Sequence, residues 1–175
     1  MNLKHIIILF VFMAFQVIGL PKNIQKKVDK EISETFQVET FMFEPFSVPD
    51  DVSKLLPSKF EADSFFQIHY NNQLLGYAYV SKAPSKTDLF DYLVLLDNEL
   101  VVLKTKVLVY REDYGGEIGS KRWLKQFIGK TQNDDLRYGD NIIAISGATI
   151  SVRSMTTAVN NLLQSLKILH SKNII

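Results

Sequence analysis

Apolar side chains recur at every fourth position near the start of the chain. Ile24, Val28, Ile32 and Phe36 follow this spacing, and lysines and glutamates occupy most positions between them. Side chains four residues apart lie on one face of a helix, so the pattern predicts an amphipathic helix over residues 24–36. Its polar face carries both charge signs, which favours packing on the domain over a membrane-surface role.

A second helical pattern lies near the end of the chain. Apolar residues keep a spacing of three and four from residue 150 to residue 169, which is typical of a helix with one buried stripe. This stripe consists of Val152, Met155, Val159, Leu162, Leu163, Leu166 and Leu169.

Between residues 65 and 110 the period changes to two. The run FFQIHYNNQLLGYAYVSKA contains two β-type segments separated by Asn71 and Asn72, and DYLVLLDNELVVLKTKVLVYRE repeats the pattern around Asp97 and Asn98. Asparagine tolerates the left-handed backbone of a tight hairpin. The sequence therefore predicts four strands in two hairpins, and an α+β fold with a predominantly antiparallel sheet, an N-terminal amphipathic helix and a C-terminal helix.

The region between the first helix and the strands is interrupted by three prolines, Pro45, Pro49 and Pro57. We expect an irregular approach segment there. The predicted organisation is a signal peptide over residues 1–19, a helix and approach segment over residues 20–64, and the functional domain over residues 65–175.

The first 19 residues have the layout of a secretory signal peptide. Lys4 precedes an unbroken apolar run over residues 6–15, and the small residue Gly19 comes just before a polar segment. The run is shorter than the ~20 apolar residues of a spanning helix, so a retained anchor is the weaker alternative. We expect an exported protein, in the periplasm or attached to the outer side of the cytoplasmic membrane.

Composition narrows the chemistry. The chain has 175 residues, of which 20 are basic and 19 acidic, and it has no cysteine. Balanced charge gives no strong field to attract nucleic acid, so we expect no nucleic-acid partner. The lack of thiols excludes disulfides, iron–sulfur clusters and thiolate zinc sites. Redox chemistry would therefore need a cofactor held by something other than sulfur.

Glycine and basic residues gather around the single tryptophan. Half of the eight glycines lie within residues 111–131, together with Lys121, Arg122, Trp123 and Phe127. Backbone near Gly116 and Gly119 could approach a ligand closely, and Trp123 with Lys121 could contact a planar ring that has an anionic edge. A wide turn followed by a short helix, with the two aromatic residues on its core face, is the alternative.

A turn of small residues precedes the last helix. It reads Ser146, Gly147, Ala148 and Thr149, and Ser151 and Arg153 follow in the first turn. Free amides at a helix start carry partial positive charge, so these residues could hold a phosphate. The plainer interpretation is a helix N-cap, which a Ser/Thr-rich start usually forms. The Glu112, Asp113 and Glu117 carboxylates could act as acid and base, although a solvated loop is the commoner role.

The segment IAISGATISVRSMTTAV, residues 143–159, resembles the signature of the FMN-binding domain family. That family includes the C subunit of the sodium-translocating NADH:quinone oxidoreductase and the G subunit of Rnf electron-transport complexes. The resemblance implies FMN as cofactor and a phosphoester bond between FMN and the last threonine of the motif, which is Thr149 here. It also implies a dedicated flavin transferase as the modifying partner.

One position departs from the family pattern. The family has an aspartate three residues before the serine of the motif, and this chain has Ile143 there. A transferase that reads the aspartate would not accept this chain. A buried Ile143 in a core strand formed by the IIAI run is the structural interpretation of this position.

These observations favour an exported flavoprotein that carries FMN on Thr149 and relays electrons between membrane or periplasmic redox proteins, rather than a stand-alone catalyst. Lys121 or Arg122 would then stabilise the anionic reduced flavin. Two alternatives stay open: a domain that binds FMN without a covalent bond, and a flavin-free binding or assembly domain.

Overall fold

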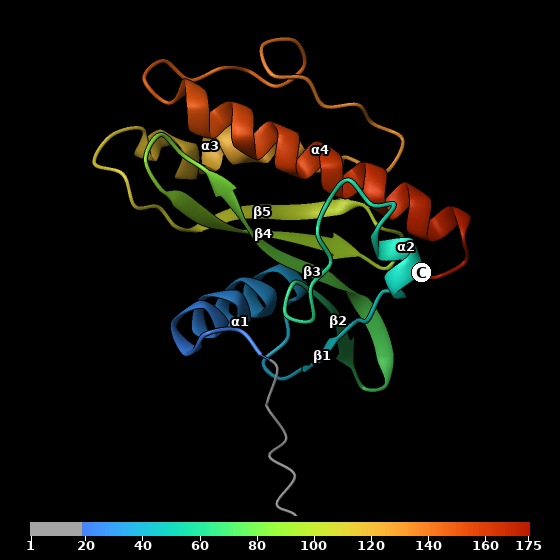
Figure 1. The fold of residues 1–175 in the computed structure, drawn as a ribbon. Helices are drawn as coiled ribbons and strands as arrows, with labels where there is room; N and C mark the ends of the chain where they lie inside the picture. The colour runs from blue at the N-terminus through green and yellow to red at the C-terminus, as the bar shows by residue number, and fades with distance from the viewer. Residues whose placement is uncertain (1–18) are drawn as a thin grey trace, which may run out of the picture.

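The computed structural model describes residues 19–175, which form one antiparallel sheet between two helices (Figure 1). The predicted signal peptide, apart from Gly19, lies outside the described residues. The helices are α1 (Lys22–Phe36), α2 (Asp50–Ser53), η1 (Gly116–Gly119), α3 (Lys121–Leu124), η2 (Lys125–Phe127) and α4 (Thr149–Ser171). The strands are β1 (Met42–Pro45), β2 (Phe65–Tyr70), β3 (Gln73–Pro84), β4 (Leu89–Asp97) and β5 (Val102–Val109).

The five strands lie in sequence order, and each pairs antiparallel with the next. The α+β class, the antiparallel sheet and both long helices are confirmed. The β2–β3 turn has positive φ angles of 50° at Asn71 and 62° at Asn72, as the hairpin prediction requires. The β4–β5 connection is longer than the predicted two-residue turn, because β5 begins only at Val102 and Leu100 takes the left-handed conformation.

The edge strand β1 lies inside the segment that was predicted to be irregular, so that prediction is wrong over this stretch. Met42–Pro45 pairs with β2, and the Phe43 ring stacks on Phe66 with centroids 4.2 Å apart. A four-residue segment ending in proline carries little local strand signal, and a proline is compatible with a strand end at a sheet edge. The pairing with β2 supplies what the local sequence does not.

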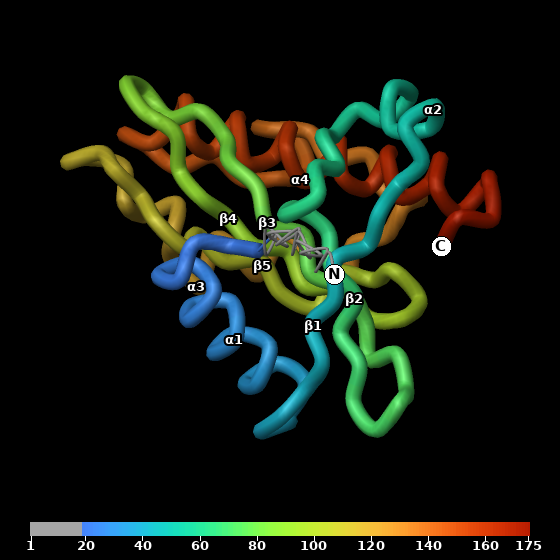
Figure 2. Tube along the Cα trace, turned by 60° about the horizontal axis from the view of Figure 1, so that its bottom comes forward, coloured from blue at the N-terminus to red at the C-terminus, as the bar shows by residue number. Residues whose placement is uncertain are grey.

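Two cores lie on opposite faces of the sheet, and Figure 2 shows α1 and α4 on opposite sides of the strands. The stripe of α4 packs against one face, and its residues Val152, Met155 and Val159 are fully buried. The stripe of α1, with Ile24, Val28 and Ile32, packs against the other face. The C-terminal Ile174 and Ile175 pack against the core on the α4 face, which includes Val52 of α2.

An ion cluster around the buried Glu31 carboxylate holds α1 on the sheet. The Glu31 carboxylate lies 2.5 Å from Nζ of Lys104 and 3.2 Å from Nζ of Lys106, both on β5. Burial alone would raise the pKa of Glu31, but the hydrogen bonds and charges of the two lysines outweigh it and hold the pKa below its usual value. Among residues 19–175, we find no helix with the length and apolar character needed to cross a membrane.

Candidate cofactor site at the start of helix α4

A cleft of about 630 Å³ lies at the first turn of α4, within the usual size range of small-molecule sites. Three segments form it: the β3–β4 turn, the chain that follows β5, and the turn that leads into α4. Its lining residues are Lys86, Thr87, Tyr110, Glu112, Asp113, Tyr114, Gly147, Ala148, Thr149, Ile150 and Ser151.

The start of α4 is open to an anion. Within the part of the chain that the structure describes, no side chain caps this helix, whose N-cap residue is Ala148. The backbone N–H groups of the first turn therefore keep their partial positive charge for a ligand. Thr149 is the first helical residue and is exposed, so its hydroxyl is accessible beside these amides.

Gly115 allows the loop after β5 to touch the turn before α4. Its φ is +83°, and a Cβ there would lie 2.9 Å from Oη of Tyr110 and 3.3 Å from Cβ of Ala148. Only glycine accommodates both the left-handed backbone and this close approach. Gly147, with φ +82°, gives the turn its own left-handed step.

The Tyr110 hydroxyl lies between the two sides of the cleft. It is 3.0 Å from Oγ of Ser151 on α4, and it donates to the main-chain oxygen of Tyr114 at 3.1 Å. Because the phenol has one proton, Ser151 is the donor in the first bond. The Tyr110 ring packs against Phe90 of β4, with ring centroids 6.0 Å apart.

Glu112 lines the cleft and holds the β3–β4 turn. It accepts hydrogen bonds from the Ser85 hydroxyl at 2.6 Å, from the Thr87 N–H at 2.6 Å and hydroxyl at 2.9 Å, and from the Asp88 N–H at 3.2 Å. The Ser85 hydroxyl, followed by the Thr87 groups, lowers the pKa of Glu112 to about 2. A carboxylate so firmly ionised is a structural acceptor at neutral pH, not a proton donor.

The structure brings together four of the predicted site residues. Gly147, Ala148, Thr149 and Ser151 line the cleft. Ser151 is buried and its hydroxyl bonds to Tyr110, so the side chain faces the protein instead of a phosphate.

Six predicted site residues lie outside the cleft lining: Ser146, Arg153, Gly116, Gly119, Lys121 and Trp123. Ser146 is exposed, and the Arg153 guanidinium stacks on the Tyr138 ring at 5.0 Å from its centroid. Lys121 is exposed on α3. At Gly116 and Gly119, no described atom would lie within 4 Å of an added Cβ, and neither has a positive φ.

Trp123 belongs to the core, which is the alternative that the sequence left open. It is 5% exposed and packs edge-on against the fully buried Phe127, with centroids 5.2 Å apart. Its indole N–H donates to the main-chain oxygen of Ile143 at 2.7 Å. Trp123 therefore supports the loop before α4, and neither aromatic side chain offers an open ring face to a ligand.

The interpretation of Ile143 as part of a buried core strand is wrong. Its side chain is 69% exposed, and only the preceding Ile142 is buried, in an isolated bridge with Tyr138. The main chain of Ile143 is held on both sides, because its N–H donates to Oε1 of Gln126 at 2.8 Å and its oxygen accepts from Trp123. Residue 143 thus presents its side chain to solvent from a fixed backbone.

Sequence reasoning missed several lining residues. Tyr110, Tyr114 and Ile150 line the cleft, and Tyr114 is 86% exposed. Tyr114 lies in the same glycine-rich segment as Trp123, but it lacks the adjacent basic residues that mark Trp123. Lys86 and Thr87 belong to a turn whose proximity to α4 depends on the folded sheet, and no local pattern marks them.

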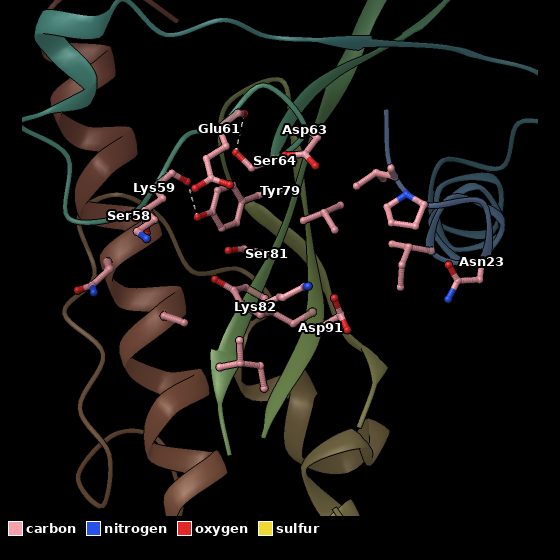
Figure 3. A pocket seen from close by; sticks show the side chains of 18 of the residues that line it. Asn23, Ser58, Lys59, Glu61, Asp63, Ser64, Tyr79, Ser81, Lys82 and Asp91 are labelled. Carbon is pink, nitrogen blue, oxygen red and sulfur yellow. Dashed lines mark hydrogen bonds between the residues drawn. The ribbon is translucent and has the colours of Figure 1, made fainter. Parts of the chain in front are cut away.

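A second cleft, of about 730 Å³, lies between the start of α1 and the middle of α4 (Figure 3). Tyr79 points into the middle of this region and donates from its hydroxyl to the main-chain oxygen of Lys59 at 2.8 Å. The Asp91 carboxylate there is paired with Arg111 at 2.5 Å. None of the residues predicted for cofactor binding lines this cleft.

Comparison with known proteins shows what this domain is similar to. Residues 90–164 match the model of the FMN-binding domain family, a range that contains the lining residues from Tyr110 to Ser151. The crystal structure of NqrC from Shewanella oneidensis has a similar fold, with a TM-score of 0.55. That similarity covers 82% of this chain and 97% of that chain at 14% sequence identity, so it shows the fold.

The search of curated proteins found no match for this chain. The resemblance drawn from residues 143–159 is nevertheless confirmed by the family match and the shared fold, and FMN is the cofactor that the family implies. Residues 90–164 of this chain therefore match the FMN-binding domain family, and the chain shares the fold of NqrC.

Proposed function

We propose that this chain is an exported electron-transfer flavoprotein that holds FMN at Thr149, joined by a phosphoester bond. The observation that carries the proposal is the exposed Thr149 at an uncapped helix start, in a cleft whose lining from Tyr110 to Ser151 lies within the family match. A phosphate bound there would meet the backbone amides of the first turn of α4.

The residues of the cleft fit the rest of the cofactor. Tyr114, 86% exposed, and Ile150, 51% exposed, both line the cleft and offer apolar surface for the flavin ring. Lys86 adds a positive charge at the rim for anionic atoms of the cofactor. When bound, FMN supplies the electron-accepting and electron-donating chemistry, and the protein sets its orientation and surroundings.

Thr149 needs an external enzyme to become a nucleophile. A threonine hydroxyl is weak unless a base or metal activates it. The lining contains two carboxylates, Glu112 and Asp113, and Glu112 is already committed to the β3–β4 turn, with its pKa lowered to about 2. We therefore propose a flavin transferase as the modifying partner.

Co-expression of the mature chain with a flavin transferase tests covalent attachment. We expect a fluorescent protein band on a denaturing gel for the wild type and none for Thr149→Ala. Thr157→Ala, at an exposed position two turns further along α4, is the matched control and should keep the band. An equal band in Thr149→Ala, or no band in the wild type, contradicts the covalent bond.

The second candidate is a domain that binds FMN without a covalent bond. Ile143 favours this candidate, because it replaces the aspartate of the family pattern. The position is exposed, so a flavin transferase that docks on the loop would meet isoleucine there. Yellow protein that loses its flavin on denaturation would select this candidate. Colourless protein after co-expression would select a flavin-free binding domain.

The proposal also covers where the protein works and what it exchanges electrons with. We propose that residues 1–19 direct export and that the flavin exchanges electrons with membrane or periplasmic redox proteins. The apolar run at the start of the chain supports the first part, and the cysteine-free composition is compatible with a cofactor held through a hydroxyl. Mass determination of the exported protein checks removal of the leader: a mass that retains residues 1–19 contradicts it.

A further inference from the structure

We propose that Tyr110 and Ser151 are positioning residues for the FMN site: their hydrogen bond fixes the loop that bears Tyr114 against the first turn of α4. This inference rests on the proposed function, since it assigns the pair a role in FMN binding. Neither residue needs to touch the cofactor for this role.

The geometry connects three elements through one hydroxyl. The Tyr110 Oη atom bonds to Ser151 Oγ at 3.0 Å, and the same atom donates to the Tyr114 oxygen at 3.1 Å. Ser151 is 3% exposed, so its hydroxyl has no ready access to solvent as a substitute partner. The ring of Tyr110 is held in turn by Phe90, which is fully buried in β4.

The loop beyond this contact depends on it. Tyr114 itself is almost fully exposed, so its side chain contributes little to its own placement. Gly115 follows in the left-handed conformation and lies against both the Tyr110 hydroxyl and Ala148. Without the hydroxyl, we expect residues 113–117 to become mobile and Tyr114 to move away from the first turn of α4.

Three variants test the assignment: Tyr110→Phe, Ser151→Ala and the double variant. Tyr110→Phe keeps the ring contact with Phe90 and removes only the hydroxyl. The measurement is a titration of free FMN into the apoprotein by fluorescence quenching, together with the flavin content after co-expression with a transferase. Tyr70→Phe, on the distant β2–β3 hairpin, is the matched control.

We expect each single variant to weaken FMN binding by about 3- to 10-fold, the range that one hydrogen bond supplies. The double variant should be no weaker than the worse single variant, because both remove the same bond. The melting temperature of each variant should fall by no more than the loss of one hydrogen bond explains. A loss of FMN affinity can then be distinguished from general destabilisation. Affinity equal to that of the Tyr70→Phe control, or additive losses in the double variant, overturns the assignment.

A second measurement uses the apoprotein alone. A glutamyl endopeptidase should cut at the exposed Glu117 several times faster in Tyr110→Phe than in the wild type. If the wild type binds no FMN but this difference is present, the proposed function fails and the positioning of the loop stands. Equal cutting rates, whatever the flavin content, overturn the role of the hydroxyl in holding the loop.

Discussion

Single atoms decide the shape of the cofactor cleft. The absent Cβ of Gly115 lets the loop after β5 touch Ala148, and the Tyr110 hydroxyl joins that loop to α4. Nearby glycines have no comparable constraint, because an added Cβ at Gly116 would lie more than 4 Å from any described neighbour. Within this cluster, Gly115 is therefore the glycine at which contact with the turn before α4 excludes a side chain.

Gly115→Ala should lower the free energy of unfolding by about 1–2 kcal/mol from the left-handed backbone alone, with the contact to Tyr110 adding to the loss. Gly116→Ala is the matched control and should change it by less than about 0.5 kcal/mol. Urea unfolding of both variants measures the difference. Equal midpoints and slopes for the two variants would show that the loop relaxes without cost.

Ile143→Asp should increase covalent flavin attachment by a transferase that reads the family's aspartate. The side chain is 69% exposed and its backbone is held by Trp123 and Gln126, so the substitution changes the presented group without disturbing the core. In-gel flavin fluorescence measures attachment. Ile128→Asp, at a position 52% exposed on another loop, is the control and should have no effect. Unchanged attachment in both would mean that residue 143 is not read.

At the scale of elements, two carboxylates join segments that are distant in sequence. Glu31 connects α1 to β5, and Glu112 connects the end of β5 to the β3–β4 turn. In both, the ionised form is the one that bonds, so the pKa lies below its ordinary value. A carboxyl with a lowered pKa in the folded state stabilises the fold above its unfolded pKa, and the contribution is lost as pH falls.

For Glu112, this reasoning places the loss between about pH 5 and pH 2, because the folded pKa is about 2. The Thr87 and Asp88 amides, which donate to the carboxylate, should keep their chemical shifts down to about pH 3 and then move together. Glu112→Gln should shift both amides already at neutral pH. A titration midpoint of these amides near pH 4.5 would contradict the hydrogen-bonded arrangement.

For Glu31, the stability of the wild type should decline as pH falls below about 5, and Glu31→Gln should flatten that decline. At neutral pH the variant should lose about 1–3 kcal/mol, because it leaves two lysines without their buried partner. Chemical unfolding at pH 7 and pH 4 measures both effects. Glu34→Gln, at an exposed position on the same helix, is the control.

At the scale of the whole molecule, the elements that the sequence predicts correctly are those marked by a local periodicity. The elements that it misses depend on contacts between segments distant in sequence. The α1 and α4 stripes and the hairpin at Asn71 and Asn72 are local patterns, and the structure confirms them. β1 exists because β2 lies beside it, and Lys86 reaches the cleft because the sheet places its turn near α4.

The site was predicted in part for the same reason. The start of α4 is a local signal and identified Thr149, whereas the orientation of Trp123 and the exposure of Ile143 depend on how the loop before α4 packs. An aromatic residue four positions from another fits both a ligand wall and a core face. Only the packed structure separates these two interpretations.

The fold also predicts how far the domain can be shortened. Residues 20–64 were predicted as a region separate from residues 65–175, and α1 within it packs against one face of the sheet. Burying Ile24, Val28 and Ile32 contributes about 1.5–3 kcal/mol each, which together is comparable to the ~5–15 kcal/mol stability of a whole domain. A chain that starts at residue 65 should therefore aggregate or unfold, whereas one that starts at residue 20 should fold. Circular dichroism and sedimentation velocity compare the two, and a folded, monomeric 65–175 chain would show that the sheet does not need α1.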